Sequence, residues 1–175
     1  PHVLFVRGDV TRLPFPDSSI DTVTNMGLME YVDDEDTTLQ ETARVLKPGG
    51  IVIITLPNVS SPFRLWHRFM RQVFSFLRKV FSNHRRVGYL DAMLGPFGQD
   101  VLGHREYSQR EYRERLRRLG LQTVDVCGYN FKIALTPLDK WAPRLSIALA
   151  RKLEVLARTP LRFMGTSFII KAQKV

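Results

Sequence analysis

The stretch LKPGGIVIITLPN, residues 46–58, decides the fold class of this chain. Its centre, Ile51 to Thr55, is apolar without alternation, which is typical of a β-strand covered on both faces in a parallel sheet. A Pro-Gly-Gly turn precedes the run, and Pro57-Asn58 follow it. The stretch therefore predicts a central strand that the chain enters from a tight turn.

The segments upstream of this strand predict an alternation of strands and helices. Residues 33–46 open with four acidic residues, which suit a helix N-terminus, and then carry apolar residues at helical spacing. Two further strands are expected at 20–24 and 3–6, where β-branched and aromatic residues lie between turn clusters. Strand, turn, strand, helix, strand indicates an α/β fold with a mostly parallel sheet.

The downstream third completes this pattern. Ser108 to Glu111 form a capping-box sequence, and the helix that they open is expected to end at Leu119-Gly120. We expect a strand at 121–126, a helix at 142–157 and a closing strand at 167–172.

Composition excludes several classes of protein. The chain has 175 residues, a formal net charge of +9 and one cysteine, so neither an internal disulfide framework nor a multi-cysteine metal site is expected. We expect no metal at all. The charge is uneven, at −5 over residues 1–58, +7 over 59–90 and +7 over 91–175. Such asymmetry indicates segments with different purposes.

Ligands of open parallel sheets bind at the carboxyl ends of the strands, so the residues just after each strand are the candidate site. Asp9 follows the first expected strand and suits an exocyclic amine or a ribose hydroxyl. Asn25, Met26 and Leu28 follow the second and suit a flat heterocycle. The alternative is that Asp9 caps a turn and that Met26 and Leu28 belong to the core.

Residues 62–86 carry most of the unexplained charge. From Pro62 to Phe81, apolar and aromatic residues recur every three or four positions with arginines between them, which predicts a basic amphipathic helix. Three uses stay open: contact with an anionic membrane surface, a lid over a lipophilic acceptor, or plain packing. Nucleic acid is a rival partner that we do not expect, because no zinc spacing, Gly-rich RNA signature or recognition-helix pattern accompanies the charge.

Three motifs in order carry a family resemblance. Residues 8–23, GDVTRLPFPDSSIDTV, are followed by LMEYV at 28–32 and by LQETARVLKPGG at 39–50, with a Pro-Asn pair at 57–58. This arrangement resembles class I S-adenosylmethionine-dependent methyltransferases of the small-molecule and quinone-biosynthesis group. HREYS at 104–108 resembles, less closely, the segment before the sixth strand of that family.

The resemblance implies a Rossmann-like methyltransferase sheet, mostly parallel with a final antiparallel strand, and S-adenosyl-L-methionine as cofactor. It places Asp9 and Val10 at the adenine ring, and Asn25 and Met26 beside the adenosyl and methionine groups. Glu41 and Arg44 would be structural. The Gly-rich loop and the acidic residue after it lie outside these residues, so we read the chain as N-terminally truncated and expect about half a cofactor site, without tight binding.

Methyl transfer depends mainly on positioning, and a general base helps only where the acceptor must lose a proton. His104, Tyr107 and Tyr31 are weak candidates for that base, with a loop or capping role as the alternative for His104. Tyr31 stands where many members of the resembled family carry His.

The expected organisation has three parts. Residues 1–58 form part of the cofactor-binding core, 59–103 a helical insertion or lid, and 104–175 the remainder of the sheet. The expected activity is methyl transfer to a small acceptor, lipophilic if the lid interpretation holds. The alternative is a non-catalytic relative that binds a membrane or a partner through the basic helix. We expect a cytoplasmic protein, in the membrane-binding case at the inner face of the membrane.

Overall fold

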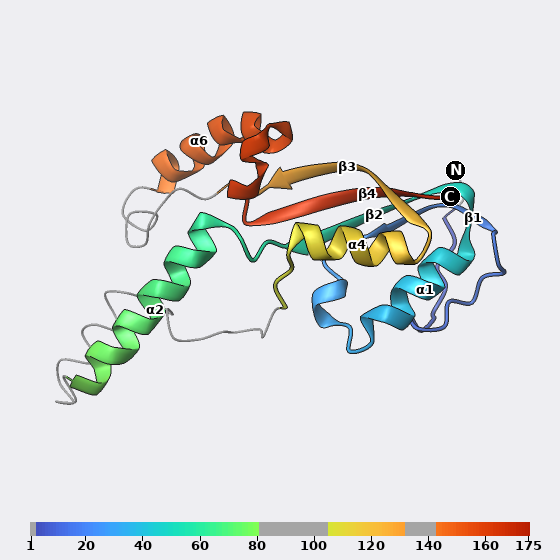
Figure 1. Ribbon diagram of the computed structural model, residues 1–175, viewed down its shortest axis with the longest axis horizontal. Coiled ribbons are helices and arrows are strands. Elements are labelled where there is room, and N and C mark those ends of the chain that lie inside the picture. Colours follow the sequence, from blue (N-terminus) through green and yellow to red (C-terminus); the bar gives the residue numbers. More distant parts are fainter. Residues whose placement is uncertain (1–2, 81–104, 132–142) are drawn as a thin grey trace. The chain divides into compact units, whose positions relative to one another are not determined.

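The computed structural model describes residues 3–80, 105–131 and 143–175. A four-stranded sheet with the order β1-β2-β4-β3 organises these residues (Figure 1). In chain order, the elements are β1 (Ile20–Asn25), the 3-10 helix η1 (Met29–Tyr31), α1 (Glu35–Val45), β2 (Leu46–Pro57), α2 (Pro62–Val80), α4 (Gln109–Arg118), β3 (Leu121–Tyr129), α6 (Pro143–Leu153), the 3-10 helices η2 (Glu154–Arg158) and η3 (Pro160–Met164), and β4 (Ser167–Lys174).

The parallel pair β1 and β2 confirms the predicted α/β unit. Thr22 lies opposite Ile51 and Asn25 opposite Ile54, with a register shift between Ile20 and Thr22. The Pro-Gly-Gly segment is not a turn before the strand, as the sequence predicted, but part of β2. Gly50 packs so closely that a Cβ would lie 2.8 Å from the Lys47 carbonyl oxygen, which fits the irregular register there.

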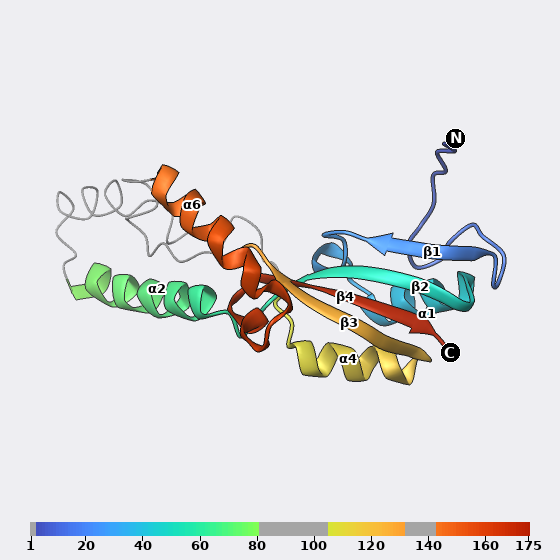
Figure 2. The same cartoon turned by 90° about the horizontal axis from the view of Figure 1, so that it is seen from above.

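The last two strands also agree with the sequence. β3 and β4 extend the strands predicted at 121–126 and 167–172. Figure 2 shows β4 running opposite to β3, so the sheet is parallel except for its last strand in the sequence. This strand order and direction make the fold a Rossmann-like α/β sheet.

Helices α1 and α4 lie on the same face of the sheet (Figure 1). α1 begins at the N-cap Asp34, whose carboxylate accepts a bond of 3.0 Å from the Thr37 backbone nitrogen. In β2, Val52 and Ile54 are fully buried, whereas Ile51 and Ile53 are only half-buried. Among the described residues, α1 and α4 cover one face of the sheet, and coverage of the other face stays a prediction.

The predicted strand at 3–6 is not formed. Residues 3–6 pair with no strand of the described chain, and their side chains are exposed, Phe5 by 92%. An apolar, β-branched run favours extended backbone, but it becomes a strand only where a neighbouring strand accepts its hydrogen bonds.

The remaining helices begin and end close to the predicted positions. α2 occupies 62–80, and α6 with η2 occupies the span predicted as one helix. α4 begins at the N-cap Ser108, but the capping-box bond from that side chain is absent. Gly120 follows α4 with a φ of 73°, as the C-terminal glycine predicted. Within the described ranges, no helix is both long and apolar enough to cross a membrane.

The chain divides into two compact units. The first unit comprises Pro1–Leu56, Tyr107–Val126 and Ile169–Val175, and the second comprises Pro57–Glu106 and Cys127–Phe168. By sequence, the first unit holds 11 basic and 12 acidic side chains, and the second holds 15 basic and 5 acidic. The second unit therefore carries a net charge of +10 and the first −1. The three-part division at 58 and 103 stays a prediction.

Candidate functional site

The carboxyl end of β1 holds the centre of the candidate site, within the first unit. Asn25 is the last residue of β1 and is 5% exposed. Its side-chain nitrogen donates to the sulfur of Met29 over 3.0 Å. Asn25 Oδ1 is buried and has no hydrogen-bond partner among the residues that the structure describes. A buried acceptor without a donor costs roughly 1–3 kcal/mol, so such an atom is a candidate ligand contact.

The turn after Asn25 is fixed to the neighbouring strand. Gly27 has a φ of 64°, a conformation that glycine adopts without strain. Its backbone nitrogen donates to the Thr55 hydroxyl in β2 over 2.7 Å. Thr55 is 5% exposed, and this part-buried bond ties the two strand ends together.

Tyr107 reaches the same turn from the residues before α4. Its hydroxyl lies 3.0 Å from the Met29 carbonyl oxygen and 2.9 Å from Glu35 Oε1. Glu35, at the start of α1, is 6% exposed and also pairs with Arg115 over 2.8 Å. Tyr107 is itself 8% exposed. Its hydroxyl is thus committed to Met29 and Glu35 in this structure, and its role as a base stays a prediction.

Asp9 lies in a small exposed turn. Its carboxylate accepts from the backbone nitrogen and the hydroxyl of Thr11, both over 2.8 Å. These bonds, the backbone one first, hold the pKa of Asp9 below its ordinary value. Among the described residues, the hydrogen bonds of Asp9 stay within 9–12, and Val10 is half-buried. The turn-capping alternative for Asp9 is therefore realised, which leaves its ligand role a prediction.

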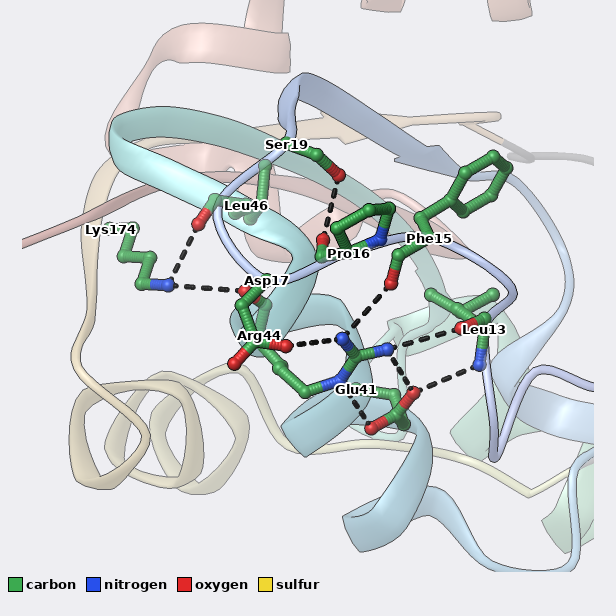
Figure 3. Close-up of polar contacts among 9 residues, drawn as sticks. All are labelled: Leu13, Phe15, Pro16, Asp17, Ser19, Glu41, Arg44, Leu46 and Lys174. Carbon is green, nitrogen blue, oxygen red and sulfur yellow. Dashed lines mark hydrogen bonds and ion pairs between the residues drawn. The ribbon is translucent and has the colours of Figure 1, made fainter.

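The loop that follows Asp9 is held by α1 (Figure 3). Arg44 donates to the carbonyl oxygens of Leu13 and Phe15 over 3.1 and 3.0 Å, and it pairs with Asp17. Glu41 accepts from the Leu13 backbone nitrogen over 2.9 Å and pairs with Arg44 over 2.8 Å. The side-chain bond from Arg44 is the main cause that lowers the pKa of Glu41. This arrangement gives Glu41 and Arg44 the structural role expected of them.

The other predicted residues are placed as follows. Met26 is 64% exposed, so it is not the core residue that the alternative required, and Leu28 is half-buried. Tyr31 belongs to η1 and is 56% exposed. The structure thus joins Asn25 and Tyr107 through Met29, whereas Asp9 keeps to its own turn. His104 lies outside the described residues.

Comparison with known proteins shows likeness to methyltransferases in sequence and in fold. Residues 1–54 match the family model described as "Methyltransferase domain". The demethylmenaquinone methyltransferase of Anoxybacillus flavithermus is 30% identical over 138 residues, which are 76% of this chain and 54% of that protein. The corresponding enzyme of Streptomyces avermitilis is 34% identical over 128 residues, or 71% of this chain and 52% of that protein. Residues 1–54 therefore belong to the methyltransferase domain family, and the chain is similar to S-adenosylmethionine-dependent methyltransferases.

Solved structures of this methyltransferase family share the fold. The chain superimposes with a TM-score of 0.55 and 18% identity on a Thermotoga maritima structure described as a SAM-dependent methyltransferase, possible histamine N-methyltransferase. That match covers 97% of this chain and 63% of the other. The chain spans about half the length of the curated relatives given above. S-adenosyl-L-methionine is the cofactor of the family.

Sequence reasoning missed two residues of this candidate site. Thr55 was read only as part of an apolar strand, although a single hydroxyl near the end of such a strand was a usable signal. Glu35 was read as one of several acids that suit a helix N-terminus. Glu35 is buried and pairs with Arg115, which lies 80 positions away along the chain. No local sequence pattern reveals a contact at that separation. In the described part of the chain, no cluster of three or more His, Cys, Asp or Glu could hold a metal ion.

Proposed function

We propose that this chain supplies part of the S-adenosylmethionine site of an enzyme that methylates a small molecule. The observation that carries the proposal is the buried, unpartnered Asn25 Oδ1 at the carboxyl end of β1. The family resemblance does not by itself identify Asn25 Oδ1 as a contact of the cofactor. An oxygen that is already desolvated loses little on binding a donor, so an adenosyl amino group or the methionine ammonium is a suitable partner for it.

The other residues that the family resemblance assigns to the site fit the cofactor in chemical type. Met26 offers exposed apolar surface for a flat ring, and Asp9 offers a carboxylate for hydroxyl or amino donors. When bound, S-adenosylmethionine supplies an electrophilic methyl group. The chain's own residues then have to bind and orient, because displacement at carbon needs an aligned acceptor rather than a metal or a covalent intermediate. Tyr31 and His104 remain candidates for accepting a proton, whereas the Tyr107 hydroxyl already bonds to Met29 and Glu35.

The acceptor that we favour is a lipophilic ring. One support is that relatives are named for demethylmenaquinone. The other is that the second unit exposes apolar side chains, which suit contact with a lipophilic molecule. The alternative acceptor is a small polar molecule. Activity assays with demethylmenaquinone against polar amines distinguish the two, and methylation of the amine alone would end the quinone proposal.

The cofactor proposal is tested by titration with S-adenosylhomocysteine, carried into the millimolar range because the expected affinity is weak. Asn25→Ala removes the unpartnered oxygen and is expected to lower the affinity about fivefold, the worth of one hydrogen bond. Thr24→Ala is the matched control, since Thr24 is an exposed neighbour on the same strand. Equal affinities of the wild type and Asn25→Ala would contradict the assignment of this atom.

A second candidate function is contact with an anionic membrane through residues 62–86. The second unit carries the net charge of +10, and α2 exposes Leu65, Trp66, Phe69 and Phe76. Trp66 and Phe69 lie with ring centroids 6.1 Å apart. Cationic surfaces with exposed aromatic side chains bind anionic lipid headgroups and insert their rings at the interface. This proposal includes a cytoplasmic location at the inner face of the membrane.

Polar contacts within the second unit organise the start of α2. Arg64 pairs with Glu106 and donates to the Thr166 carbonyl oxygen, both over 3.0 Å. Arg68 also pairs with Glu106. One acid thus receives two arginines, so this cluster keeps a net positive charge beside the exposed aromatic side chains.

Co-sedimentation with vesicles tests the membrane contact. Vesicles with phosphatidylglycerol are expected to bind the wild type, and vesicles of phosphatidylcholine alone are not. Phe69→Ser with Phe76→Ser is expected to reduce binding at least tenfold. Val124→Ser, an exposed apolar residue of the first unit, is the control and should bind like the wild type. Equal binding by the double variant and the wild type would contradict membrane contact through α2, and binding to a nucleic-acid duplex instead would support the rival partner.

A further inference from the structure

Tyr107, just before α4, and Tyr112, within α4, differ in the hydrogen bonding of their hydroxyl groups. Tyr107 and Tyr112 pack edge to face, with ring centroids 5.4 Å apart and an interplanar angle of 83°. Both are buried, at 8% and 2% exposure. The Tyr107 hydroxyl bonds to Met29 and Glu35, whereas the buried Tyr112 hydroxyl has no hydrogen-bond partner within the described part of the chain.

Two hydrogen bonds connect Tyr107 to Asn25 through Met29. Tyr107 contacts the Met29 carbonyl oxygen over 3.0 Å, and the Met29 sulfur accepts the Asn25 side-chain nitrogen over 3.0 Å. Met29 is fully buried, so its backbone and its side chain are both held in place. The Asn25 nitrogen bond decides which way the amide plane turns, and hence where Oδ1 lies.

The other side of Tyr107 is anchored by charge. Glu35 Oε1 lies 2.9 Å from the tyrosine hydroxyl, and Glu35 Oε2 pairs with Arg115 Nη1 over 2.8 Å. Arg115 Nε also donates to Asp36 Oδ1 over 2.6 Å, and this bond is the main cause that raises the pKa of Arg115. Glu35 is thereby held between α1 and α4, and a hydroxyl next to a paired carboxylate has little freedom to rotate.

We propose that Tyr107 is a positioning residue that sets the orientation of Asn25 through Met29, and thereby the affinity of the site for the adenosyl cofactor. The proposal rests on the proposed function, because it assigns a purpose to the Asn25 oxygen. It assigns Tyr107 no contact with substrate or cofactor. Tyr112, which packs on the same ring but bonds to neither Met29 nor Asn25, has no such role.

The pair of tyrosines supplies matched variants. Tyr107→Phe keeps the ring and removes the hydroxyl that holds Met29, and Tyr112→Phe removes a hydroxyl without a partner. Selective 15N labelling of asparagine reports the outcome, because the chain contains only Asn25, Asn58, Asn83 and Asn130. The Asn25 side-chain signals are assigned as the pair that disappears in Asn25→Ala.

In Tyr107→Phe, the Asn25 side-chain signals are expected to move while the other three asparagine pairs stay in place. The affinity for S-adenosylhomocysteine is expected to fall about fivefold, as for the loss of one hydrogen bond. Tyr112→Phe is expected to change neither quantity. A general loss of packing would instead shift several asparagine pairs in both variants.

Unmoved Asn25 signals in Tyr107→Phe would overturn the positioning role, as would equal movement in Tyr112→Phe. Moved signals with unchanged affinity would show that the orientation does not serve the site. If the wild type binds no S-adenosylhomocysteine, the proposed function fails, and the Asn25 signals alone decide whether Tyr107 positions this residue.

Met29→Leu provides a second variant if Tyr107→Phe does not fold. Leucine has a similar volume but no sulfur, so the Asn25 nitrogen loses its acceptor while the Met29 backbone is kept. Movement of the Asn25 signals with a similar loss of affinity would support the pathway. Unchanged signals and affinity would overturn it.

Discussion

Gly27 and Thr55 join the carboxyl ends of β1 and β2 through a hydrogen bond of 2.7 Å from the Gly27 backbone nitrogen to the Thr55 hydroxyl. The bond lies next to Asn25, which carries the unpartnered oxygen. It therefore connects the stability of the sheet to the shape of the candidate site.

Thr55→Val keeps the shape of the side chain but removes the hydroxyl, so the Gly27 nitrogen loses its partner. The free energy of unfolding is expected to fall by about 0.5–1.5 kcal/mol, as for the loss of one part-buried hydrogen bond. Urea denaturation measures the change. Thr55→Ser keeps the hydroxyl and should recover most of the hydrogen-bond contribution, and equal losses in both variants would show that the methyl group matters rather than the bond.

Arg44→Lys removes the planar guanidinium that holds the Leu13 and Phe15 carbonyl oxygens together with Glu41 (Figure 3). A lysine ammonium cannot keep this geometry, so the loop at 13–17 should be cleaved at least severalfold faster in limited proteolysis. Arg118→Lys is the control, because the Arg118 side chain is 74% exposed and its ion pair lies on the surface. Cleavage of the loop at the wild-type rate in Arg44→Lys would contradict the holding role.

The lowered pKa of Glu41 gives the loop a dependence on pH. Its ordinary value is 4.5, and Arg44 holds the folded value below that. A carboxylate with a depressed pKa stabilises the folded state above its unfolded pKa, and the contribution is lost as the pH falls through the folded pKa. Stability measured between pH 6 and 2 should therefore fall less steeply below about 4.5 in Glu41→Gln than in the wild type. Parallel curves of stability against pH for the two proteins would show that Glu41 does not contribute to the loss of stability in acid.

Asn58 performs a comparable holding role in the second unit. Its side-chain nitrogen donates to the carbonyl oxygens of Phe163 and Gly165 over 2.9 and 2.8 Å, and Asn58 is fully buried. Asn58→Ala is expected to lower the free energy of unfolding by about 2–4 kcal/mol, because two carbonyls lose a donor and a cavity forms. Ser60→Ala, at an exposed neighbouring position, should change it by less than about 0.5 kcal/mol. Thermal unfolding at one protein concentration compares the two, and equal shifts would contradict the account.

The sequence predicted the elements best where the signal is local. α1 lies within the span predicted from its acidic first turn and apolar spacing, and β3 and β4 include the strands predicted at 121–126 and 167–172. The prediction at 3–6 was wrong because a strand depends on a neighbour that local propensity does not report. The Pro-Gly-Gly segment was misplaced for a similar reason, since it lies in the irregular stretch of β2 between the pairing of Ile20 with Leu46 and that of Thr22 with Ile51, which local sequence does not report.

The sequence predicted only part of the candidate site. Asn25 was found from its place after a strand, but its burial and its unpartnered oxygen depend on Met29 and Tyr107, the latter 78 positions away from Met29. Pairings at that separation are set by packing of α1 and α4 on the sheet. A pattern of residues along the chain cannot report them.

The central claim is that the adenosyl cofactor binds at the carboxyl end of β1, with Asn25 as a direct contact. Titration of the 15N-labelled chain with S-adenosylhomocysteine tests it most directly, since NMR detects weak binding and reports its place. We expect the largest shifts at the Asn25 side-chain amide and at the backbone of Met26 and Gly27. Saturating ligand that leaves these signals unmoved, or that shifts only residues of the second unit, would contradict it.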